Sequence, residues 1–280
     1  MPKVSVLIPN YNTKEEWLKK SIQSILDQTF QDFEIIVLDD GSKISPENLI
    51  KSFNDERIKF YQNEKNLGIG KTRNKLLELA NGKYAAFQDS DDISLPQRLE
   101  KQVDFLEKNP DFSGASAWSE TFPNKKILKT PQEPKIIDFL GGCRFLQPCA
   151  MLKIEDFKKQ NLYYNDNFTT SEDYDLWTRT IENLKLYNIQ EVLLKYRRNP
   201  NSLVHTKHNE ITKNDKIIKQ RLLDKLTLDE NLQKDLIKFI SKKSQKKSKL
   251  SERLFSIRNE WDGLQKKKIL QILGIKIKLK

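Results

Sequence analysis

The first hundred residues alternate short apolar runs with segments whose apolar residues recur at helical spacing. Runs rich in β-branched residues predict buried strands, and apolar residues three or four positions apart predict amphipathic helices. Because strands alternate with helices, we expect an α/β fold with a mostly parallel central sheet flanked by helices. The predicted strands cover residues 4–8, 33–38, 58–61 and 83–87, and the predicted helices cover residues 14–28 and 70–80.

Three polar clusters directly follow predicted strands. They are residues 9–12, 39–42 and 89–92. Ligands of open α/β sheets bind beyond the carboxyl ends of the strands. The sequence therefore predicts a binding site in these three loops.

The pattern becomes less regular in the middle of the chain and changes again after about residue 205. Prolines interrupt the middle third, where we expect a strand near residues 145–152 and a helix near residues 172–183. Residues 209–240 have the apolar spacing of a helix. Residues 241–249 hold five lysines and no apolar residue, a pattern typical of a solvated linker.

The net charge of +11 suggests at first a nucleic-acid or membrane partner. Residues 205–280, however, hold 21 of the 50 basic and 9 of the 39 acidic residues, a net charge of +12, so residues 1–204 have a net charge of −1. A nucleic-acid-binding protein usually presents a basic face on its folded body, so this distribution argues against that class. We expect a folded domain over residues 1–205 and a helical, lysine-rich extension over residues 206–280.

Composition excludes further classes. Hydrophobic residues make up 37% of the chain, yet its longest apolar runs are about four residues, whereas a membrane-spanning helix needs about 20. Strand-like sequence starts at residue 4, so we expect no signal peptide. Cys143 and Cys149 are too few for a disulfide scaffold or a four-ligand zinc site. We therefore expect a cytoplasmic protein with reduced cysteines.

Acidic residues stand where the predicted strands end. Asp89 and Asp91 follow an apolar strand, and two such carboxylates can hold a divalent cation that binds phosphate oxygens. Asp39 and Asp40 begin either a simple turn or a loop that accepts hydrogen bonds from a nucleoside. Arg73 near a helix start is either part of an anion site or a surface ion pair.

Taken together, the motifs resemble the inverting family-2 glycosyltransferases of bacterial surface-polysaccharide synthesis, which have the GT-A fold. The resemblance covers roughly residues 1–205. It implies transfer of a sugar from a nucleotide diphosphate donor to an acceptor hydroxyl with Mg or Mn. The motifs, in the order and spacing of that family, are residues 4–12, 39–42, 66–74, 89–92 and 171–177.

The resemblance also implies individual roles. Asp173 is implied as the general base, and Asp91 and Asp89 as metal ligands. The residues implied in nucleotide-sugar binding are Pro9, Tyr11, Asp39, Asp40, Arg73, Asp89 and Ser90. The residues expected near the acceptor or the diphosphate are Glu172, Trp177, Arg197 and Arg198. Surface charge remains open for the two arginines, and His205 is either a further metal ligand or part of a polar loop.

Such a mechanism has a physical basis. A sugar hydroxyl is a poor nucleophile, so a carboxylate should remove its proton as it attacks the anomeric carbon. A divalent cation neutralises the charge that develops on the departing diphosphate. One base and one metal give a single displacement with inversion, whereas a double displacement needs a second carboxylate as nucleophile. The sequence leaves that second route open, and the resemblance favours inversion.

Two alternative functions remain. The first is a sugar-1-phosphate nucleotidyltransferase, which would share the fold and the metal, but it needs a glycine-rich loop after the first strand, and residues 9–13 contain no glycine. The absence of glycine there also argues against a dinucleotide dehydrogenase, which needs Gly-x-Gly-x-x-Gly at the same place. The other alternative is a basic nucleic-acid- or membrane-binding protein without catalysis.

The lysine-rich tail has two interpretations. Its lysines could meet anionic lipid head groups at about 1 kcal/mol each, with insertion of Ile269, Leu270, Ile272 and Leu273. Alternatively, these aliphatic residues pack on protein, and the alternation over residues 275–280 fits an edge strand. We favour a peripheral enzyme on the inner face of the cytoplasmic membrane, with a UDP-sugar donor, a glycan or lipid-linked acceptor of lipopolysaccharide or capsule, and no nucleic-acid partner.

Overall fold

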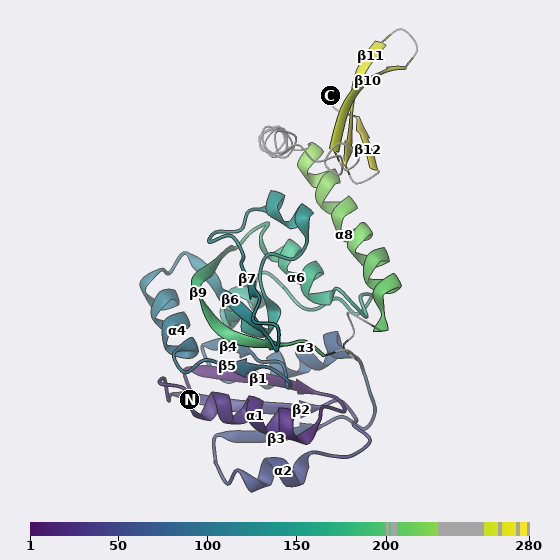
Figure 1. Ribbon diagram of the computed structural model, residues 1–280. Helices are drawn as coiled ribbons and strands as arrows, with labels where there is room; N and C mark the ends of the chain where they lie inside the picture. The colour runs from purple at the N-terminus through teal and green to yellow at the C-terminus, as the bar shows by residue number, and fades with distance from the viewer. Residues whose placement is uncertain (200–201, 203–205, 229–254, 263–264, 273–274, 279–280) are drawn as a thin grey trace.

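The computed structural model describes residues 1–199, 202, 206–228, 255–262, 265–272 and 275–278 (Figure 1). Its main sheet has nine strands in the order β3-β2-β1-β4-β8-β6-β9-β5, with β7 paired to β6. These strands are β1 (Val4–Asn10), β2 (Phe33–Asp39), β3 (Ile58–Gln62), β4 (Tyr84–Phe87), β5 (Ile93–Ser94), β6 (Phe112–Phe122), β7 (Ile127–Leu128), β8 (Met151–Lys153) and β9 (Lys185–Arg197).

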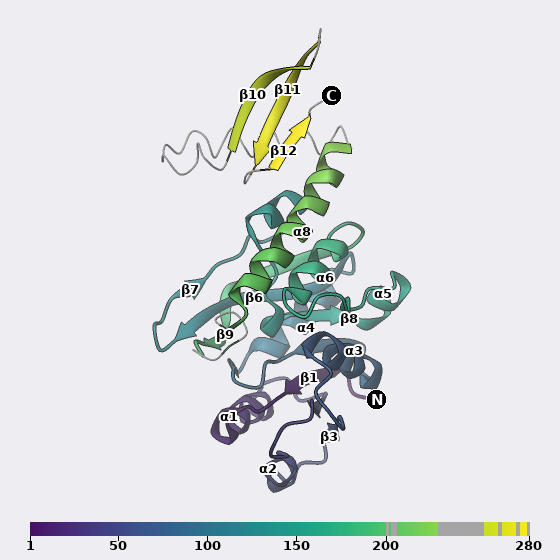
Figure 2. The same cartoon turned by 90° about the vertical axis from the view of Figure 1, so that its right-hand side faces the viewer.

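Helices cover both faces of this sheet (Figures 1 and 2). They are α1 (Glu15–Leu26), α2 (Glu47–Ser52), α3 (Ile69–Leu79), α4 (Arg98–Lys108), α5 (Ile154–Lys159), α6 (Glu172–Thr180) and α8 (His208–Leu228), with the 3₁₀ turns η1 (Ile136–Gly141) and η2 (Gln147–Cys149). The α/β architecture predicted from the alternating pattern is confirmed.

The amino-terminal half of the sheet is parallel, which sets the position of the acidic loops. Strand β1 pairs in parallel with β2 and β4, and β2 pairs in parallel with β3. All seven residues of β1 and of β2 are buried, as expected for parallel strands covered on both faces. The loops that follow these strands consequently leave the sheet at one edge.

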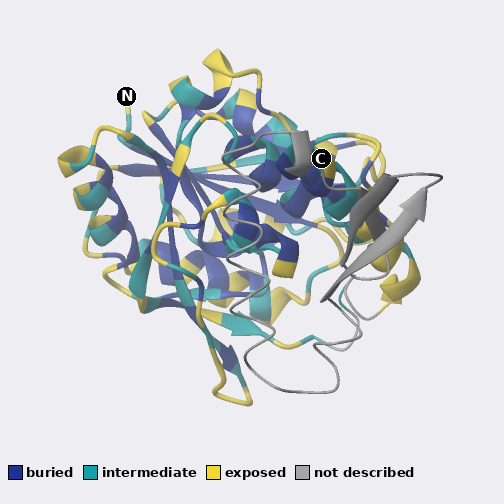
Figure 3. Cartoon of the chain, turned by 90° about the horizontal axis from the view of Figure 1, so that it is seen from above, coloured by how far each residue is buried: buried dark blue, intermediate teal, exposed yellow. Residues whose placement is uncertain are grey.

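Alternate residues of the strands serve two separate cores. Leu7 packs in a cluster with residues of α3, α6 and η1. Its neighbours Val6 and Ile8 pack on the other face with residues of α1 and α4. Successive side chains of a strand point to opposite faces, so one sheet supports two apolar layers, and the buried residues follow the sheet and the inner helix faces in Figure 3.

The middle third differs from the sequence prediction. The strand expected near residues 145–152 is shorter, because η2 occupies Gln147–Cys149 and β8 covers only Met151–Lys153. Pro148 explains the difference, since proline lacks the N–H that a central strand must donate.

Helix α8 belongs to the same body as the sheet. Its buried residues Ile218, Leu222, Leu223 and Leu226 lie in the cluster that contains Leu7 and Trp177. A boundary at residue 205 would separate this helix from its own core. We therefore propose that the catalytic body extends to Leu228.

The tail contains strands where we expected a helical extension. A three-stranded antiparallel sheet consists of β10 (Phe255–Asp262), β11 (Gln265–Ile272) and β12 (Ile275–Lys278). The expectation of helix is wrong for these residues. In β12 the alternation of isoleucine and lysine has the period of a strand. Residues 241–249 and Leu273 lie outside the described residues. Within the described residues, no helix is long and apolar enough to cross a membrane.

Core packing of α8 predicts a difference in stability between two faces of the helix. Leu222→Ala and Leu223→Ala should each lower the free energy of unfolding by about 2–5 kcal/mol, because each removes a buried side chain. Ile217→Ala is the matched control, since Ile217 is 50% exposed, and should change it by less than about 1 kcal/mol. Urea unfolding followed by circular dichroism measures both, and equal losses would contradict a packed α8.

Candidate active site

Asp39 ends β2 and organises the loop after it. Its carboxylate accepts hydrogen bonds from Asn10 Nδ2 at 2.7 Å, the Ser42 amide at 3.0 Å and Gln62 Nε2 at 3.0 Å. The parallel register places Asn10 opposite Asp39. Since Asp39 is fully buried, its carboxylate fixes three segments relative to one another.

Asp40 fixes the approach to α3. Its carboxylate accepts from the Leu67 and Gly68 amides, both at 2.9 Å, and from Asn63 Nδ2 at 2.8 Å. Gly41 has a φ of +71°, and a Cβ there would lie 2.7 Å from the backbone carbon of Lys65. The two loops therefore touch backbone to backbone, and only glycine fits at this position.

The remaining residues expected at the nucleotide lie around these loops. Pro9 is buried in β1, whereas Tyr11 is 50% exposed. Ser90 Oγ and Thr13 Oγ1 are 2.7 Å apart. A polar cavity of about 380 Å³ is lined by Gly41, Ser42, Gln62, Asn63 and Glu64. The sheet edge thus offers an open polar cavity, and the exposed Tyr11 directly follows β1 at the same edge.

Arg73 of α3 joins the end of β4 to the start of α6. Its Nη1 donates to Glu172 Oε1 at 2.5 Å and its Nη2 to Asp89 Oδ1 at 3.2 Å. The Arg73 side chain is 6% exposed. Burial alone would lower the pKa of Arg73, but Asp89 and Glu172 raise it, so Arg73 stays cationic between two acids. This junction brings the predicted metal ligand Asp89 and the acidic motif of α6 to one place.

Asp173 follows Glu172 in the first turn of α6 and is half-buried. Its Oδ1 accepts from the Tyr174 amide at 2.7 Å. Burial raises the pKa of Asp173, against the opposing effect of Arg73. Burial likewise raises the pKa of Glu172 to about 7, although Arg73 opposes the shift. Two acids with raised pKa values beside one arginine form a group that can take up a proton near neutral pH.

Asp91 and Asp92 lie beyond β4. Burial and the neighbouring Asp89 raise the pKa of Asp91 to about 6. Asp92 is fully buried, and burial raises its pKa well above the ordinary value. Its Oδ1 accepts from the Arg197 amide at 2.7 Å, and its Oδ2 has no hydrogen-bond partner among the described residues.

Asp89 and Asp91 are the carboxylates expected to hold a divalent cation. Burial, and after it the charge of Asp89, raises the pKa of Asp91, and a bound cation would oppose both effects. The described residues contain no group of three or more His, Cys, Asp and Glu side chains arranged to hold a metal. Mg²⁺ at nucleotide sites is usually held by one or two carboxylates together with substrate phosphates, so two carboxylates suffice for this type of site.

Of the two arginines expected near the diphosphate, the structure brings Arg197 to the loop of residues 89–92. Its guanidinium lies over the rings of Trp17 at 4.6 Å and Phe122 at 4.4 Å, and its Nε donates to the Asp91 carbonyl at 2.7 Å. Arg198 is exposed and stands 5.9 Å from the ring of Tyr196. His205 lies outside the described residues.

Trp177 requires a correction. We expected it to border the acceptor, but it is fully buried and packs edge-on against Phe145 at 4.7 Å and Phe157 at 6.1 Å. It lies on the face of α6 that points into the core, so an acceptor cannot touch it.

Cys149 is buried and Cys143 is half-buried, and both are free thiols as expected.

Several residues that organise the site were not recognised in the sequence. Asn10 lies in the predicted polar cluster 9–12 but was given no role of its own, and Asn63 could have been suspected, because it lies two positions after a predicted strand. Trp17 has the spacing of an ordinary core residue of α1, and nothing in the sequence connects it with Arg197. The polar residues of α8 described below lie beyond the expected domain.

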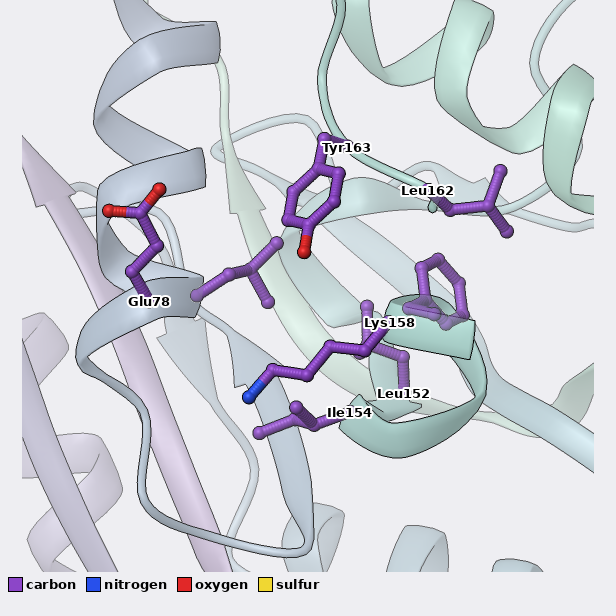
Figure 4. Close-up of a pocket in the computed structure, with 8 residues that line it drawn as sticks. Glu78, Leu152, Ile154, Lys158, Leu162 and Tyr163 are labelled. Atoms are coloured by element: carbon purple, nitrogen blue, oxygen red, sulfur yellow. The ribbon is translucent and has the colours of Figure 1, made fainter. Parts of the chain in front are cut away.

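A second cavity lies apart from this site. It has a volume of about 30 Å³ and is lined mainly by apolar side chains of α3, β8, α5 and the loop after α5 (Figure 4). Figure 4 labels Glu78, Leu152, Ile154, Lys158, Leu162 and Tyr163 among them. The acids described above are not among its lining residues, so it is not part of the candidate active site.

Comparison with protein families decides the class. The family model described as "Glycosyl transferase family 2" matches residues 5–167. The chain belongs to this family. An uncharacterized glycosyltransferase of Methanocaldococcus jannaschii is 42% identical over 207 residues, which are 70% of this chain and 71% of the relative. The family resemblance noted in the sequence is thereby confirmed.

Other similarities support the family-2 glycosyltransferase fold. An Escherichia coli protein named UDP-Glc:alpha-D-GlcNAc-diphosphoundecaprenol beta-1,3-glucosyltransferase is 31% identical over 212 residues, 74% of this chain and 82% of that protein. The crystal structure of S. aureus TarS 1-349 superposes with a TM-score of 0.63 at 21% identity, covering 77% of this chain and 65% of that structure. The family-2 glycosyltransferase therefore has the expected GT-A fold, and it spans about two thirds of the TarS structure.

The raised carboxyl pKa values predict how stability depends on pH. The folded state holds protons on Asp91, Asp92, Glu172 and Asp173 at pH values where the unfolded chain has lost them. Stability from these groups is present at low pH and is lost as the pH rises through the folded pKa values. Without metal, the free energy of unfolding should therefore fall between pH 5 and pH 8 by on the order of 1–3 kcal/mol.

Asp92→Asn should make this fall smaller, because the amide is neutral throughout. Asp111→Asn is the matched control, since the Asp111 side chain is 73% exposed. Urea unfolding in the presence of a chelator, at several pH values, measures the slope. A stability that rises between pH 5 and pH 8, or an Asp92→Asn slope equal to that of the control, would contradict the assignment.

Proposed function

We propose that this glycosyltransferase moves a sugar from a UDP-sugar to a hydroxyl of a glycan or lipid-linked acceptor by a metal-dependent single displacement with inversion. The observation that carries the proposal is the Arg73 junction, which connects Asp89 directly to Glu172, the neighbour of Asp173. The groups proposed to bind the donor and to accept the proton would thus share one edge of the sheet. Membership of the family removes the support for a nucleotidyltransferase or a non-catalytic binding protein.

The donor nucleoside is proposed to bind in the polar cavity beside Gly41 and Ser42, with the exposed ring of Tyr11 next to the base. Asp39 and Asp40 are already hydrogen-bonded to the surrounding loops. Their proposed contribution is therefore to hold the cavity in shape, with any further lone pairs directed to the nucleoside.

Asp89 and Asp91 would hold the Mg²⁺ or Mn²⁺ ion. When bound, the ion supplies positive charge where the departing diphosphate becomes negative. Arg197 lies against the backbone of Asp91. Its proposed role is to keep the loop of Asp91 in place and to add positive charge at the same edge.

Asp173 is the proposed general base. It removes the proton of the acceptor hydroxyl while that oxygen bonds to the anomeric carbon and the bond to the diphosphate oxygen breaks. The proton goes to the Asp173 carboxylate, and the electron pair leaves with the diphosphate. The raised pKa of Asp173 makes its carboxylate a stronger base than an ordinary aspartate.

The relatives support this choice of substrates. The name of the Escherichia coli relative gives UDP-glucose as donor and a lipid-linked diphosphate sugar as acceptor. TarS has been crystallised in complex with UDP-GlcNAc. We therefore propose a UDP-sugar as donor and surface-glycan synthesis as the process, with the individual sugar to be identified by experiment.

Three variants test this function. The wild type should show Mn²⁺-dependent thermal stabilisation by one or more UDP-sugars in a panel that also includes GDP- and dTDP-sugars, and Mn²⁺-dependent hydrolysis or transfer of the same donor. Asp91→Ala should lose the stabilisation and the turnover. Asp173→Asn should keep donor binding and lose turnover by roughly 10²–10⁴-fold, the usual contribution of a general base. Asp111→Asn should behave as wild type because Asp111 is exposed.

The proposed base, the proposed metal ligand and the proposed donor can each be contradicted separately. Normal turnover in Asp173→Asn would refute the base assignment. Undiminished Mn²⁺-dependent stabilisation in Asp91→Ala would refute its role as ligand. A preference for GDP- or dTDP-sugars would refute the UDP-sugar donor and leave the reaction class intact.

The tail is proposed to bring the enzyme to anionic membrane surfaces. Residues 205–280 carry a net charge of +12, and lysines near anionic lipid gain about 1 kcal/mol each. The full chain should co-sediment with phosphatidylserine-containing vesicles and lose binding at high salt. It should not co-sediment with neutral phosphatidylcholine vesicles. A chain ending at residue 240 should bind much less, and equal binding of the two chains would refute the proposal.

A further inference from the structure

Helix α8 lies alongside α6, although about 30 residues separate them in the sequence (Figures 1 and 2). Its apolar face packs in the core, as described above. A second row of α8 side chains is polar and contacts the segment that carries Asp173. These polar contacts are not needed to bury the helix, so they call for a separate explanation.

The first contacts hold the turn that precedes Asp173. Asn214 Nδ2 donates to both the carbonyl oxygen and the Oγ1 of Thr170, each at 2.9 Å. Ser171 Oγ donates to Asp215 Oδ1 at 2.9 Å. Asn214 is 8% exposed, so its hydrogen bonds are shielded from water. Two consecutive residues of α8 thus hold two consecutive residues of the turn.

The backbone of this turn is in a conformation that needs support. Ser171 has φ of 58° and ψ of 21°, the left-handed region that non-glycine residues seldom adopt. A serine at this position commonly caps the helix with its hydroxyl. Here the hydroxyl donates to Asp215 of α8 instead. The backbone conformation of Ser171, which directly precedes Glu172 and Asp173, is therefore stabilised by a residue of α8.

The second set of contacts lies just after Asp173. Asp175 is fully buried and accepts from Arg221 Nη1 at 2.7 Å and from Arg179 Nε at 2.9 Å. Arg221 Nη2 also donates to Thr178 Oγ1 at 2.7 Å. Polar residues of α8 consequently hold α6 on both sides of Asp173.

We propose that α8 is a positioning element of the active site, in which Asn214 and Asp215 hold the Thr170–Ser171 turn so that Asp173 keeps its place. This inference rests on the proposed function, in which Asp173 is the general base. Proton transfer needs the base within hydrogen-bond reach of the acceptor hydroxyl, and small misplacements of reacting groups cost large factors in rate. Asn214 and Asp215 act through the turn and touch no substrate.

Asp215→Ala is the central variant. It removes the acceptor of the Ser171 hydroxyl and should lower kcat by about tenfold. The KM for the donor sugar should stay within about twofold, because the proposed donor cavity is lined by residues of other segments. Asp215→Asn keeps an oxygen that can accept the same hydrogen bond and should restore most of kcat. Lys216→Ala, at an exposed neighbouring position of α8, is the matched control and should equal wild type.

A double-mutant cycle separates positioning from a general loss of structure. Ser171→Ala should lower kcat to a similar extent as Asp215→Ala. The double variant should have a kcat close to that of either single variant, because both substitutions remove the same hydrogen bond between Ser171 and Asp215. Thermal unfolding of each variant verifies that the protein assayed is folded, and Ser171→Ala serves as the test if Asp215→Ala does not fold.

The outcomes distinguish this inference from the proposed function. If Asp173→Asn is inactive while Asp215→Ala and Ser171→Ala keep a wild-type kcat, only the role of α8 is overturned. The role of α8 is also overturned if the donor KM of Asp215→Ala rises by as large a factor as its kcat falls. It is likewise overturned if the losses in kcat of Asp215→Ala and Ser171→Ala multiply in the double variant. Normal turnover in Asp173→Asn overturns the base assignment itself.

Discussion

The candidate site depends on a buried arginine shared between two acids. A guanidinium taken out of water needs opposite charge beside it. Asp89 and Glu172 provide that charge for Arg73 and accept hydrogen bonds from its two Nη atoms, whereas its buried Nε has no hydrogen-bond partner among the described residues. Each acid comes from a different element, so the arginine determines where the end of β4 and the start of α6 lie relative to α3. The same positive charge opposes the effect of burial on Glu172 and Asp173. One ion-pair junction thus controls both the geometry and the basicity of the site.

Much of the fold was predictable because it follows local patterns. The apolar runs at residues 4–8 and 33–38 favoured buried strands of an α/β sheet, and the acids that follow residues 33–38 were therefore expected at its carboxyl edge. The middle segment and the tail were less predictable. A proline shortened the expected strand near residue 150. In the tail we expected a helical extension, whereas residues 275–278 alternate isoleucine and lysine with the strand period and form β12.

The site was predictable in its residue types more than in its arrangement. Asp89, Arg73 and Glu172 were each expected at the site, and the structure joins them through the two Nη atoms of Arg73, a contact that the sequence did not predict. The sequence could not show that Trp177 faces the core, because an acidic motif does not reveal which face of its helix is buried. Nor could it choose between Arg197 and Arg198, whose different surroundings depend on the register of β9. The contribution of α8 was hidden, since its polar partners lie more than 40 residues away.

The bond between the Arg197 amide and Asp92 has a consequence for the order of assembly. It connects residues 105 positions apart, and the bond between Arg73 and Glu172 connects residues 99 positions apart. During synthesis, strands β1 to β4 emerge early and can pair with one another. The loop of residues 89–92 receives the hydrogen bond of the Arg197 amide only when β9 has left the ribosome. Contacts of such long sequence separation form late, because the closure of long loops costs entropy before it is repaid. A nascent chain therefore holds a nearly complete half-sheet well before it can hold a working arrangement of carboxylates.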